Sequence, residues 1–170
     1  QMNFVGKDMS THPRIQQSQK VKIGGIMTRD VVTVPEGTAL NAAADLMAQR
    51  NISSLPVVNH HNRLVGILTE ADFLSSLNIT EESAIENMFN VIIRRKRPSR
   101  KRGTTVEGLM TRKPITVGED DTLQTAINLM DRNRIKRLVV VDDDRQVIGI
   151  VSRPDLIGLF TGRRAQSSAA

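Results

Sequence analysis

Two seven-residue stretches of this chain carry a hydroxyl and a carboxylate at the same spacing. Residues 66–72 read GILTEAD and residues 149–155 read GIVSRPD, so Thr69 stands three residues before Asp72 in the first stretch. A carboxylate can accept hydrogen bonds from the vicinal hydroxyls of a ribose, and the free N–H groups at the start of a helix suit phosphate. These heptads therefore favour a site for a ribose phosphate.

The same spacing also has a purely structural interpretation. Thr69 with Asp72, and Ser152 with Asp155, both match the capping box, in which a hydroxyl and a carboxylate three residues later close the first turn of a helix. Capping explains the spacing inside one heptad. It does not explain the Gly-aliphatic-aliphatic strand before each heptad, or its recurrence at the same place, so the binding interpretation stays beside the capping one.

The heptads belong to a longer internal repeat. Aligned with an offset of 83 residues and no gap, 27–72 and 110–155 are identical at 17 positions. The shared positions include Met-Thr-Arg at the start of each copy and Val-Val in the middle. Duplicated units that cannot close a core alone usually bury a face against their copy. The chain is therefore expected to contain two related halves that pack together.

Each copy predicts the order strand, helix, strand, strand, helix, and hence the α/β class. In the first copy, 31–34 reads as a short strand, and apolar residues at three- and four-residue steps predict a helix near 39–50. Two apolar strands, 55–58 and 64–68, are joined by a polar turn as in a hairpin. A second helix follows the heptad hydroxyl. The second copy repeats this order, with its first helix near 122–133 and strands at 138–141 and 147–151.

A basic segment separates the copies. Seven of the 24 basic residues lie in 94–102, and the rest of the chain is close to neutral. This segment is either a solvated linker or a contact to an acidic partner, lipid or nucleic acid. A helix before it, from Thr80 to Ile93, has an apolar stripe that packs on its own domain or forms a dimer contact. The expected division is a tail at 1–22, repeats at 23–78 and 106–162, helix and linker at 79–105, and a tail at 163–170.

Composition excludes several classes of function. There is no Cys, so disulfides and cysteine-based zinc sites are excluded, and no apolar run is long enough to span a membrane. With no Trp or Tyr and only four Phe, the chain offers no aromatic platform for stacking bases. His60 and His61 are adjacent in a turn, where side chains are expected to point apart, and Asp142-Asp143-Asp144 forms an exposed turn, so no metal site and no catalytic residue is predicted. The expected location is cytoplasmic. The leading Gln indicates an excised or processed piece.

The repeated motifs together resemble a known family. Met27-Thr28 and Met110-Thr111 open the copies, Leu-Pro-Val-Val at 55–58 and Arg-Leu-Val-Val-Val at 137–141 follow, and each copy ends in its heptad. This arrangement, over roughly 26–160, resembles a tandem pair of cystathionine β-synthase-like (CBS) domains, or Bateman module. The resemblance implies two repeats around a pseudo-two-fold axis, with clefts that bind AMP, ADP, ATP or S-adenosylmethionine as regulatory ligands.

The resemblance also implies that each cleft combines residues of both repeats. One site would contain Thr69, Asp72, Thr111, Ile115, Thr116, Lys136, Arg137 and Val139. The other site would contain Thr28, Val32, Thr33, Ser53, Ser54, Pro56, Ser152 and Asp155. Serines occupy the positions in the second site that Lys136 and Arg137 occupy in the first, so the second site is expected to hold phosphate less tightly.

The function predicted from the sequence is therefore a regulatory adenine-nucleotide sensor that requires no cofactor and is not itself an enzyme. It would control a fused domain or a separate protein, and it would form a homodimer through helices near 39–50, 70–77, 122–133 and 155–160. The alternative is a nucleic-acid or acidic-partner binding module that acts through 94–102.

Overall fold

The computed structural model of the protein describes residues 21–76 and 104–161, which fold as two compact units. Unit 1 comprises 21–31, 115–144 and 148–161, and unit 2 comprises 32–76, 104–114 and 145–147. The chain passes from one unit to the other after Val31 and again after Pro114, which are equivalent positions of the two repeats. Each unit is therefore built from most of one repeat and the opening segment of the other.

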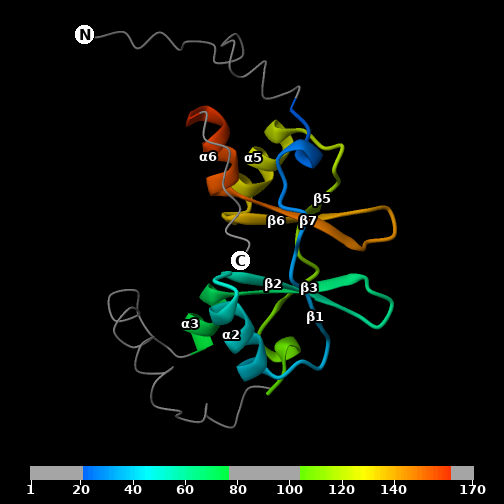
Figure 1. Cartoon of the computed structure of the whole chain (residues 1–170), viewed down its shortest axis with the longest axis vertical. Helices are drawn as coiled ribbons and strands as arrows, with labels where there is room; N and C mark the ends of the chain where they lie inside the picture. Colours follow the sequence, from blue (N-terminus) through cyan, green and yellow to red (C-terminus); the bar gives the residue numbers. More distant parts are fainter. Residues whose placement is uncertain (1–20, 77–103, 162–170) are drawn as a thin grey trace, which may run out of the picture. The chain divides into compact units, whose positions relative to one another are not determined.

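Unit 2 contains a four-stranded sheet in the order β1-β2-β3-β4 (Figure 1). The middle strands β2 and β3 are antiparallel, β1 runs parallel to β2, and β4 runs antiparallel to β3. Two α-helices and the short 3-10 helix η4 complete the unit. The bounds are β1 (Val34–Pro35), α2 (Leu40–Gln49), β2 (Ser54–Val58), β3 (Leu64–Thr69), α3 (Glu70–Ser76), η4 (Val106–Gly108) and β4 (Thr111–Arg112).

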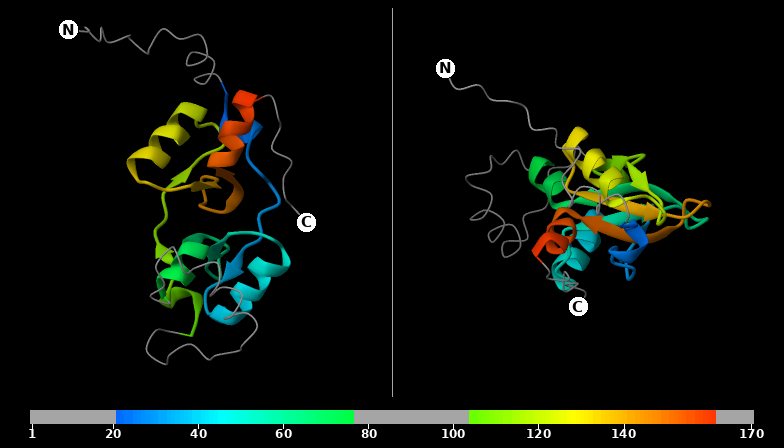
Figure 2. Two further views of the ribbon diagram at one scale, coloured as in Figure 1. Left: turned by 90° about the vertical axis from the view of Figure 1, so that its left-hand side faces the viewer. Right: turned by 90° about the horizontal axis from the view of Figure 1, so that it is seen from above.

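Unit 1 repeats this plan with a three-stranded sheet in the order β5-β6-β7. A bridge between Thr28 and Ile150 stands where unit 2 has β4. In each unit both α-helices lie on the same face of the sheet (Figure 2). The bounds are η2 (Ile23–Gly25), β5 (Thr116–Val117), α5 (Leu123–Arg132), β6 (Arg137–Val141), β7 (Val147–Ser152) and α6 (Arg153–Thr161).

The α/β class and the order of elements predicted for each repeat are confirmed. The apolar faces predicted for the first helices are also correct, since Ala43 and Met47 are buried on α2, and Leu123 and Met130 on α5. The strand predicted at 31–34 is wrong over 31–33. Regular pairing with β2 begins only at Val34, because the preceding residues carry the chain from one unit to the other.

The opening methionines explain why both heptads begin with glycine. Met110 belongs to the core that contains β2 and β3, and Met27 to the core that contains β6 and β7. A Cβ at Gly66 would lie 2.9 Å from Cγ of Met110, and one at Gly149 would lie 2.9 Å from Cγ of Met27. These are closer than carbon atoms pack, so glycine makes room for the methionine of the opposite repeat.

Equivalent main-chain hydrogen bonds hold both exchanged segments. In unit 1 the Ile23 amide donates to the Asp121 carbonyl at 2.9 Å, and in unit 2 the Val106 amide donates to the Thr38 carbonyl at 2.9 Å. The amide that begins the first helix, Leu123 or Leu40, likewise donates to the opposite repeat's segment at 2.9 Å. The exchange is therefore the same in both units at the level of the main chain.

The side chains at this junction differ between the units. In unit 1, Lys22 pairs with Asp120 at 2.5 Å, and this bond raises the pKa of the Lys22 ammonium. In unit 2 the Glu107 carboxylate accepts the Gly37 amide. The pKa of Glu107 lies below its usual value, chiefly because of a hydrogen bond with Thr105. Gly37 has φ of +84°, a conformation that glycine adopts without strain.

Several sequence-based predictions lie outside the described residues, namely the helix over 80–93, the basic segment 94–102, the tail at 163–170 and the tail at 1–22 up to residue 20. Val21 and Lys22, which end the predicted first tail, instead contact the second repeat in unit 1. Within 21–76 and 104–161, no helix is long and apolar enough to cross a membrane. The His60 and His61 side chains were expected to point apart. Instead their rings lie close together, with centroids 3.8 Å from each other. No group of three His, Cys, Asp or Glu that could hold a metal ion occurs in the described part of the chain.

Candidate functional site

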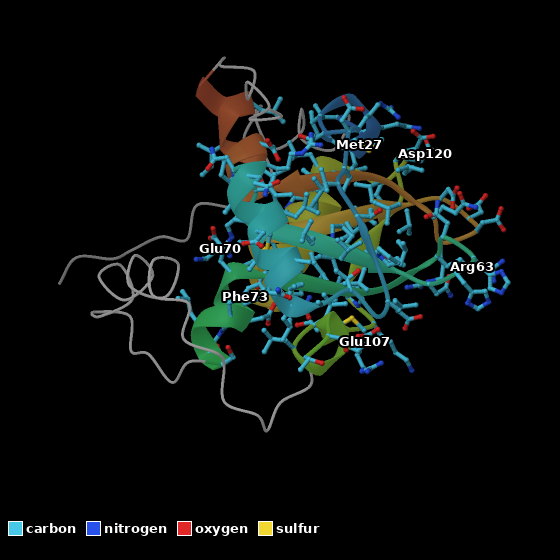
Figure 3. All side chains as sticks on the ribbon, turned by 60° about the horizontal axis from the view of Figure 1, so that its bottom comes forward. Met27, Arg63, Glu70, Phe73, Glu107 and Asp120 are labelled. Carbon is cyan, nitrogen blue, oxygen red and sulfur yellow. The ribbon has the colours of Figure 1, made fainter. Side chains whose placement is uncertain are left out.

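The first heptad forms the junction between β3 and α3. Thr69 ends the strand and Glu70 begins the helix, while Phe73 one turn later is partly buried against the core of unit 2 (Figure 3). The Asp72 carboxylate folds back on the strand end. Its Oδ2 accepts the Thr69 amide at 2.7 Å and the Thr69 hydroxyl at 2.8 Å.

The second heptad repeats this geometry at the junction between β7 and α6. Oδ2 of Asp155 accepts the Ser152 amide at 2.7 Å and the Ser152 hydroxyl at 2.6 Å. Leu156, which occupies the position equivalent to Phe73, is buried in the core of unit 1. Both carboxylates are half-buried and are held at one oxygen by two hydrogen bonds.

Each heptad forms only one of the two reciprocal hydrogen bonds of the expected capping box. The carboxylate accepts the amide of the residue before the helix, as the box requires. The hydroxyl donates to the same carboxylate oxygen instead of accepting an amide from the first turn. Among the described residues, the hydrogen bonds to each heptad carboxylate all end on Oδ2, so Oδ1 keeps its capacity to accept a hydrogen bond.

The exchanged segments place one predicted threonine near each heptad. Thr111 on β4 pairs with Ile67, two residues before Thr69. In unit 1, Thr28 pairs with Ile150, two residues before Ser152, through hydrogen bonds of 2.9 and 3.0 Å. Each unit thus combines the hydroxyl and carboxylate of one repeat with the opening threonine of the other.

The other residues predicted for each site belong to the opposite unit from its heptad. For the Asp72 site these residues are Ile115, Thr116, Lys136, Arg137 and Val139, all in unit 1. For the Asp155 site they are Val32, Thr33, Ser53, Ser54 and Pro56, all in unit 2. Val139, Ser54 and Pro56 are buried in the structure, whereas Lys136 is exposed.

Two charged residues beside the heptads were not among the predicted site residues. Glu70 follows Thr69 and Arg153 follows Ser152, and both are exposed. Their opposite charge at equivalent positions of the two repeats is visible in the sequence once the repeats are aligned. A comparison of the differences between the copies, and not only of the identities, would have found them.

The comparisons with known proteins agree on one family. A family model described as "CBS domain" matches residues 23–79 and 106–162. Uncharacterized protein MJ1232 of Methanocaldococcus jannaschii is 28% identical over 143 residues, which cover 84% of this chain and 40% of the relative. Inosine-5'-monophosphate dehydrogenase of the same organism is 29% identical over 157 residues, which cover 92% of this chain and 27% of the enzyme. The chain thus spans two fifths or less of the length of these relatives.

Two solved structures match this chain over nearly their whole length. The CBS domain pair of protein MJ0100, in complex with 5'-methylthioadenosine and S-adenosyl-L-methionine, has a TM-score of 0.63 and 29% identity, and covers 84% of this chain and 97% of that one. CBSX2 of Arabidopsis thaliana in complex with AMP has a TM-score of 0.67 and 26% identity, with the same two coverages. The comparisons give no support to the alternative function through the basic segment.

Proposed function

We propose, because this chain belongs to the CBS domain family, that it is a regulatory module that binds an adenosine ligand. The ligand class is AMP, ADP, ATP or S-adenosylmethionine, and its binding controls a fused domain or a separate partner. The proposal assigns the chain no catalytic residue and no required cofactor. Where a relative is an enzyme, such as inosine-5'-monophosphate dehydrogenase, this chain matches about a quarter of it, so any regulated activity belongs to other residues.

The observation that carries the proposal is the pair of carboxylates held by their own strand ends. Asp72 and Asp155 are each fixed through Oδ2 by an amide and a hydroxyl of the same heptad. A carboxylate that is held at one oxygen and has capacity at the other is suited to the 2′- and 3′-hydroxyls of a ribose. The solved CBS pairs with AMP and with S-adenosylmethionine support an adenosine compound as the source of that ribose.

The remaining residues predicted for the two sites stay part of the proposal. Lys136 and Arg137 are assigned to phosphate, because a guanidinium offers a bidentate charged contact and an ammonium offers a point charge. Thr111 and Thr28 are assigned to hydrogen bonds with the ligand beside Asp72 and Asp155. Substitution of each residue singly tests its assignment by the change in ligand affinity.

Helix α6 supports a homodimer as part of the proposal. Its Ile157 and Leu159 side chains are 60% and 41% exposed, and large apolar side chains at this exposure are suited to an isologous contact. Light scattering should then give about twice the chain mass of 18.8 kDa. Leu159→Glu should yield monomers, because burying an unpaired charge costs several kcal/mol. A wild-type monomer at high micromolar concentration would contradict the dimer.

The test of the proposed function is calorimetry with AMP, ATP and S-adenosylmethionine on Asp72→Asn, Asp155→Asn and the double variant. Asparagine retains an acceptor for the strand-end amide but loses the charge. A charge-assisted hydrogen bond contributes about 1.5–3 kcal/mol, so each single change should weaken its site by roughly 10- to 150-fold. The double variant should show this loss at both sites for each of the three compounds.

A helix-capping variant elsewhere separates binding from stability. The Thr122 hydroxyl accepts the Thr125 amide at 3.2 Å at the start of α5. Thr122→Ala should lower the free energy of unfolding by about 1 kcal/mol and leave ligand affinity unchanged. If Asp72→Asn and Asp155→Asn behave in the same way, the heptad carboxylates are only caps and their assignment to the ribose is wrong. A wild-type chain that binds none of the three compounds would contradict the proposed function itself.

A further inference from the structure

Glu70 and Arg153 carry opposite charges at the same position of the two repeats. Each follows the heptad hydroxyl directly, stands two residues before the heptad aspartate and is exposed. In the part of the chain that the structure describes, neither side chain takes part in an ion pair. The charge of each residue is therefore available to a molecule bound at its heptad.

The main chain holds the two residues in the same way. The Glu70 amide donates to the Ser53 carbonyl at 3.2 Å, and the Arg153 amide donates to the Lys136 carbonyl at 3.0 Å. Ser53 and Lys136 are themselves equivalent residues, which lead into the middle strands β2 and β6. The two units therefore differ here in side-chain charge and not in the path of the chain.

The neighbouring residues reinforce the contrast. At four equivalent positions around the heptads, unit 2 has two neutral and two acidic residues, while unit 1 has three basic residues and one acidic residue. The positions are Ser53, Ser54, Glu70 and Asp72 in unit 2, and Lys136, Arg137, Arg153 and Asp155 in unit 1. These four residues therefore carry a net charge of −2 in unit 2 and +2 in unit 1.

We propose that Glu70 and Arg153 determine which ligand charge each heptad accepts. Arg153 favours a phosphorylated adenosine compound beside Asp155, and Glu70 disfavours phosphate and favours a neutral or cationic adenosine compound beside Asp72. This inference rests on the proposed function, since it requires that both heptads bind adenosine ligands. Beyond the proposed function, the inference is that the two heptads prefer ligands of different charge, and that one residue at each heptad sets this preference.

The physical basis is charge at close range. Phosphate groups are attracted by a guanidinium, which can donate two parallel hydrogen bonds, and repelled by a carboxylate. S-adenosylmethionine has a sulfonium and an amino group, so a neighbouring carboxylate favours it. The expectation from the sequence weighed only Lys136 and Arg137, placed them in the Asp72 site and ranked that site first for phosphate. Both residues belong to unit 1 with Asp155, so this inference assigns their charge to the Asp155 heptad and reverses the ranking.

The test measures each site separately in the whole chain. Asp72→Asn leaves the Asp155 heptad as the functioning site, and Asp155→Asn leaves the Asp72 heptad. In each background, calorimetry gives the affinity for ATP, adenosine and S-adenosylmethionine, and the ratio of ATP to adenosine affinity reports the preference for phosphate. Because adenosine has the same ribose and base, this ratio is insensitive to a general loss of binding.

Arg153→Glu in the Asp72→Asn background should lower the ATP-to-adenosine ratio about tenfold, and Glu70→Arg in the Asp155→Asn background should raise it about tenfold. Arg153→Gln and Glu70→Gln should give about half of these changes on a logarithmic scale. Raising the salt concentration from 50 to 500 mM should reduce all of these effects, because the charges are exposed.

Matched controls reverse an exposed charge on another helix of the same unit. Asp45→Lys on α2 and Arg132→Glu on α5 should leave the ratio unchanged to within about twofold. Equal effects of these controls, or ratios that do not respond to Glu70 and Arg153, would overturn the inference while the proposed function stands. A ratio that responds only in the opposite background would overturn the assignment of each residue to its heptad. A wild-type chain that binds none of the three compounds would remove both proposals.

Discussion

The two units hold an exchanged segment with the same main-chain bonds but with different side chains. Unit 1 uses charged pairs at its surface, Lys22 with Asp120 at 2.5 Å and Arg29 with Glu119 at 3.6 Å. In unit 2 the Gly37 amide donates a hydrogen bond to the Glu107 carboxylate. Gly37 and Asp120 are equivalent residues, so the same position of the loop contributes an amide in one unit and a carboxylate in the other.

This difference indicates what the duplicated fold requires. The apolar contacts of Met27 and Met110 with the glycines, and the main-chain bonds of the exchanged segments, are present in both units. The polar side chains around them have diverged. Buried contacts therefore fix the exchange, and the exposed charges were free to become different, both at this junction and beside the two heptads.

Removing the opening methionines should give the largest effect. Met27→Ala and Met110→Ala each remove a side chain that is less than a tenth exposed, so we expect a loss of about 2–5 kcal/mol in the free energy of unfolding. Because the segments are exchanged, Met27→Ala should increase hydrogen exchange in β6 and β7, and Met110→Ala in β2 and β3. Hydrogen exchange resolved by mass spectrometry measures this, and effects confined to the repeat that carries the substitution would contradict the exchange.

Substituting the heptad glycines should have the next largest effect and should distinguish the units. Gly66→Ala meets Met110, a flexible side chain, whereas a Cβ at Gly149 also lies 3.2 Å from the Thr28 carbonyl oxygen, which cannot rotate away. We expect costs of about 1 and 3 kcal/mol respectively, measured by urea unfolding.

Gly25→Ala is the matched control for the glycine variants, since a Cβ there has no atom within 4 Å and should change stability little. Combining Gly66→Ala with Met110→Ala should cost less than the sum of the two, because the new methyl group occupies the vacated space. Strict additivity would show that the two residues do not share this contact.

The smallest effect is expected from the pH dependence of the junctions. The pKa of Glu107 is lowered in the folded chain, so its contribution to stability is present above its ordinary value of 4.5 and is lost as the pH falls through the folded value. The pKa of Lys22 is raised, so its contribution is present below its ordinary value of 10.5 and is lost as the pH rises through the folded value.

Unfolding curves of the wild type, Glu107→Gln and Lys22→Met at acid, neutral and alkaline pH measure these contributions. Glu107→Gln should flatten only the acid limb of stability against pH, and Lys22→Met only the alkaline limb. The same limb affected by both variants would mean that the two junctions are not independent.

Much of the fold follows from patterns that lie within a few residues of each other. The period of apolar residues on α2 and α5, the alternation in the hairpin strands and the hydroxyl–carboxylate spacing of the heptads are local, so the α/β class, the order of elements and the heptad junctions could be predicted. The family resemblance followed from those same patterns occurring twice in the same order.

The tertiary structure decided the features that depend on distant neighbours. Residues 31–33 have strand-like side chains, but they connect the units and pair with no strand before Val34. The Thr69 and Ser152 hydroxyls donate to a carboxylate that the fold has already turned toward them, whereas a capping pattern alone predicts that they accept.

The sequence by itself therefore determined two copies of one unit, the position of each element in it, and a hydroxyl and a carboxylate at the start of each second helix. The family resemblance implied that each opening threonine joins the heptad of the other copy, and only the tertiary structure decided which contacts hold the exchanged segments. Met27 and Met110 are both followed by Thr-Arg, and they face equivalent glycines, Gly149 and Gly66 respectively. Local pattern cannot choose between two equivalent acceptors, and the choice is made by the packing of a complete core around each methionine.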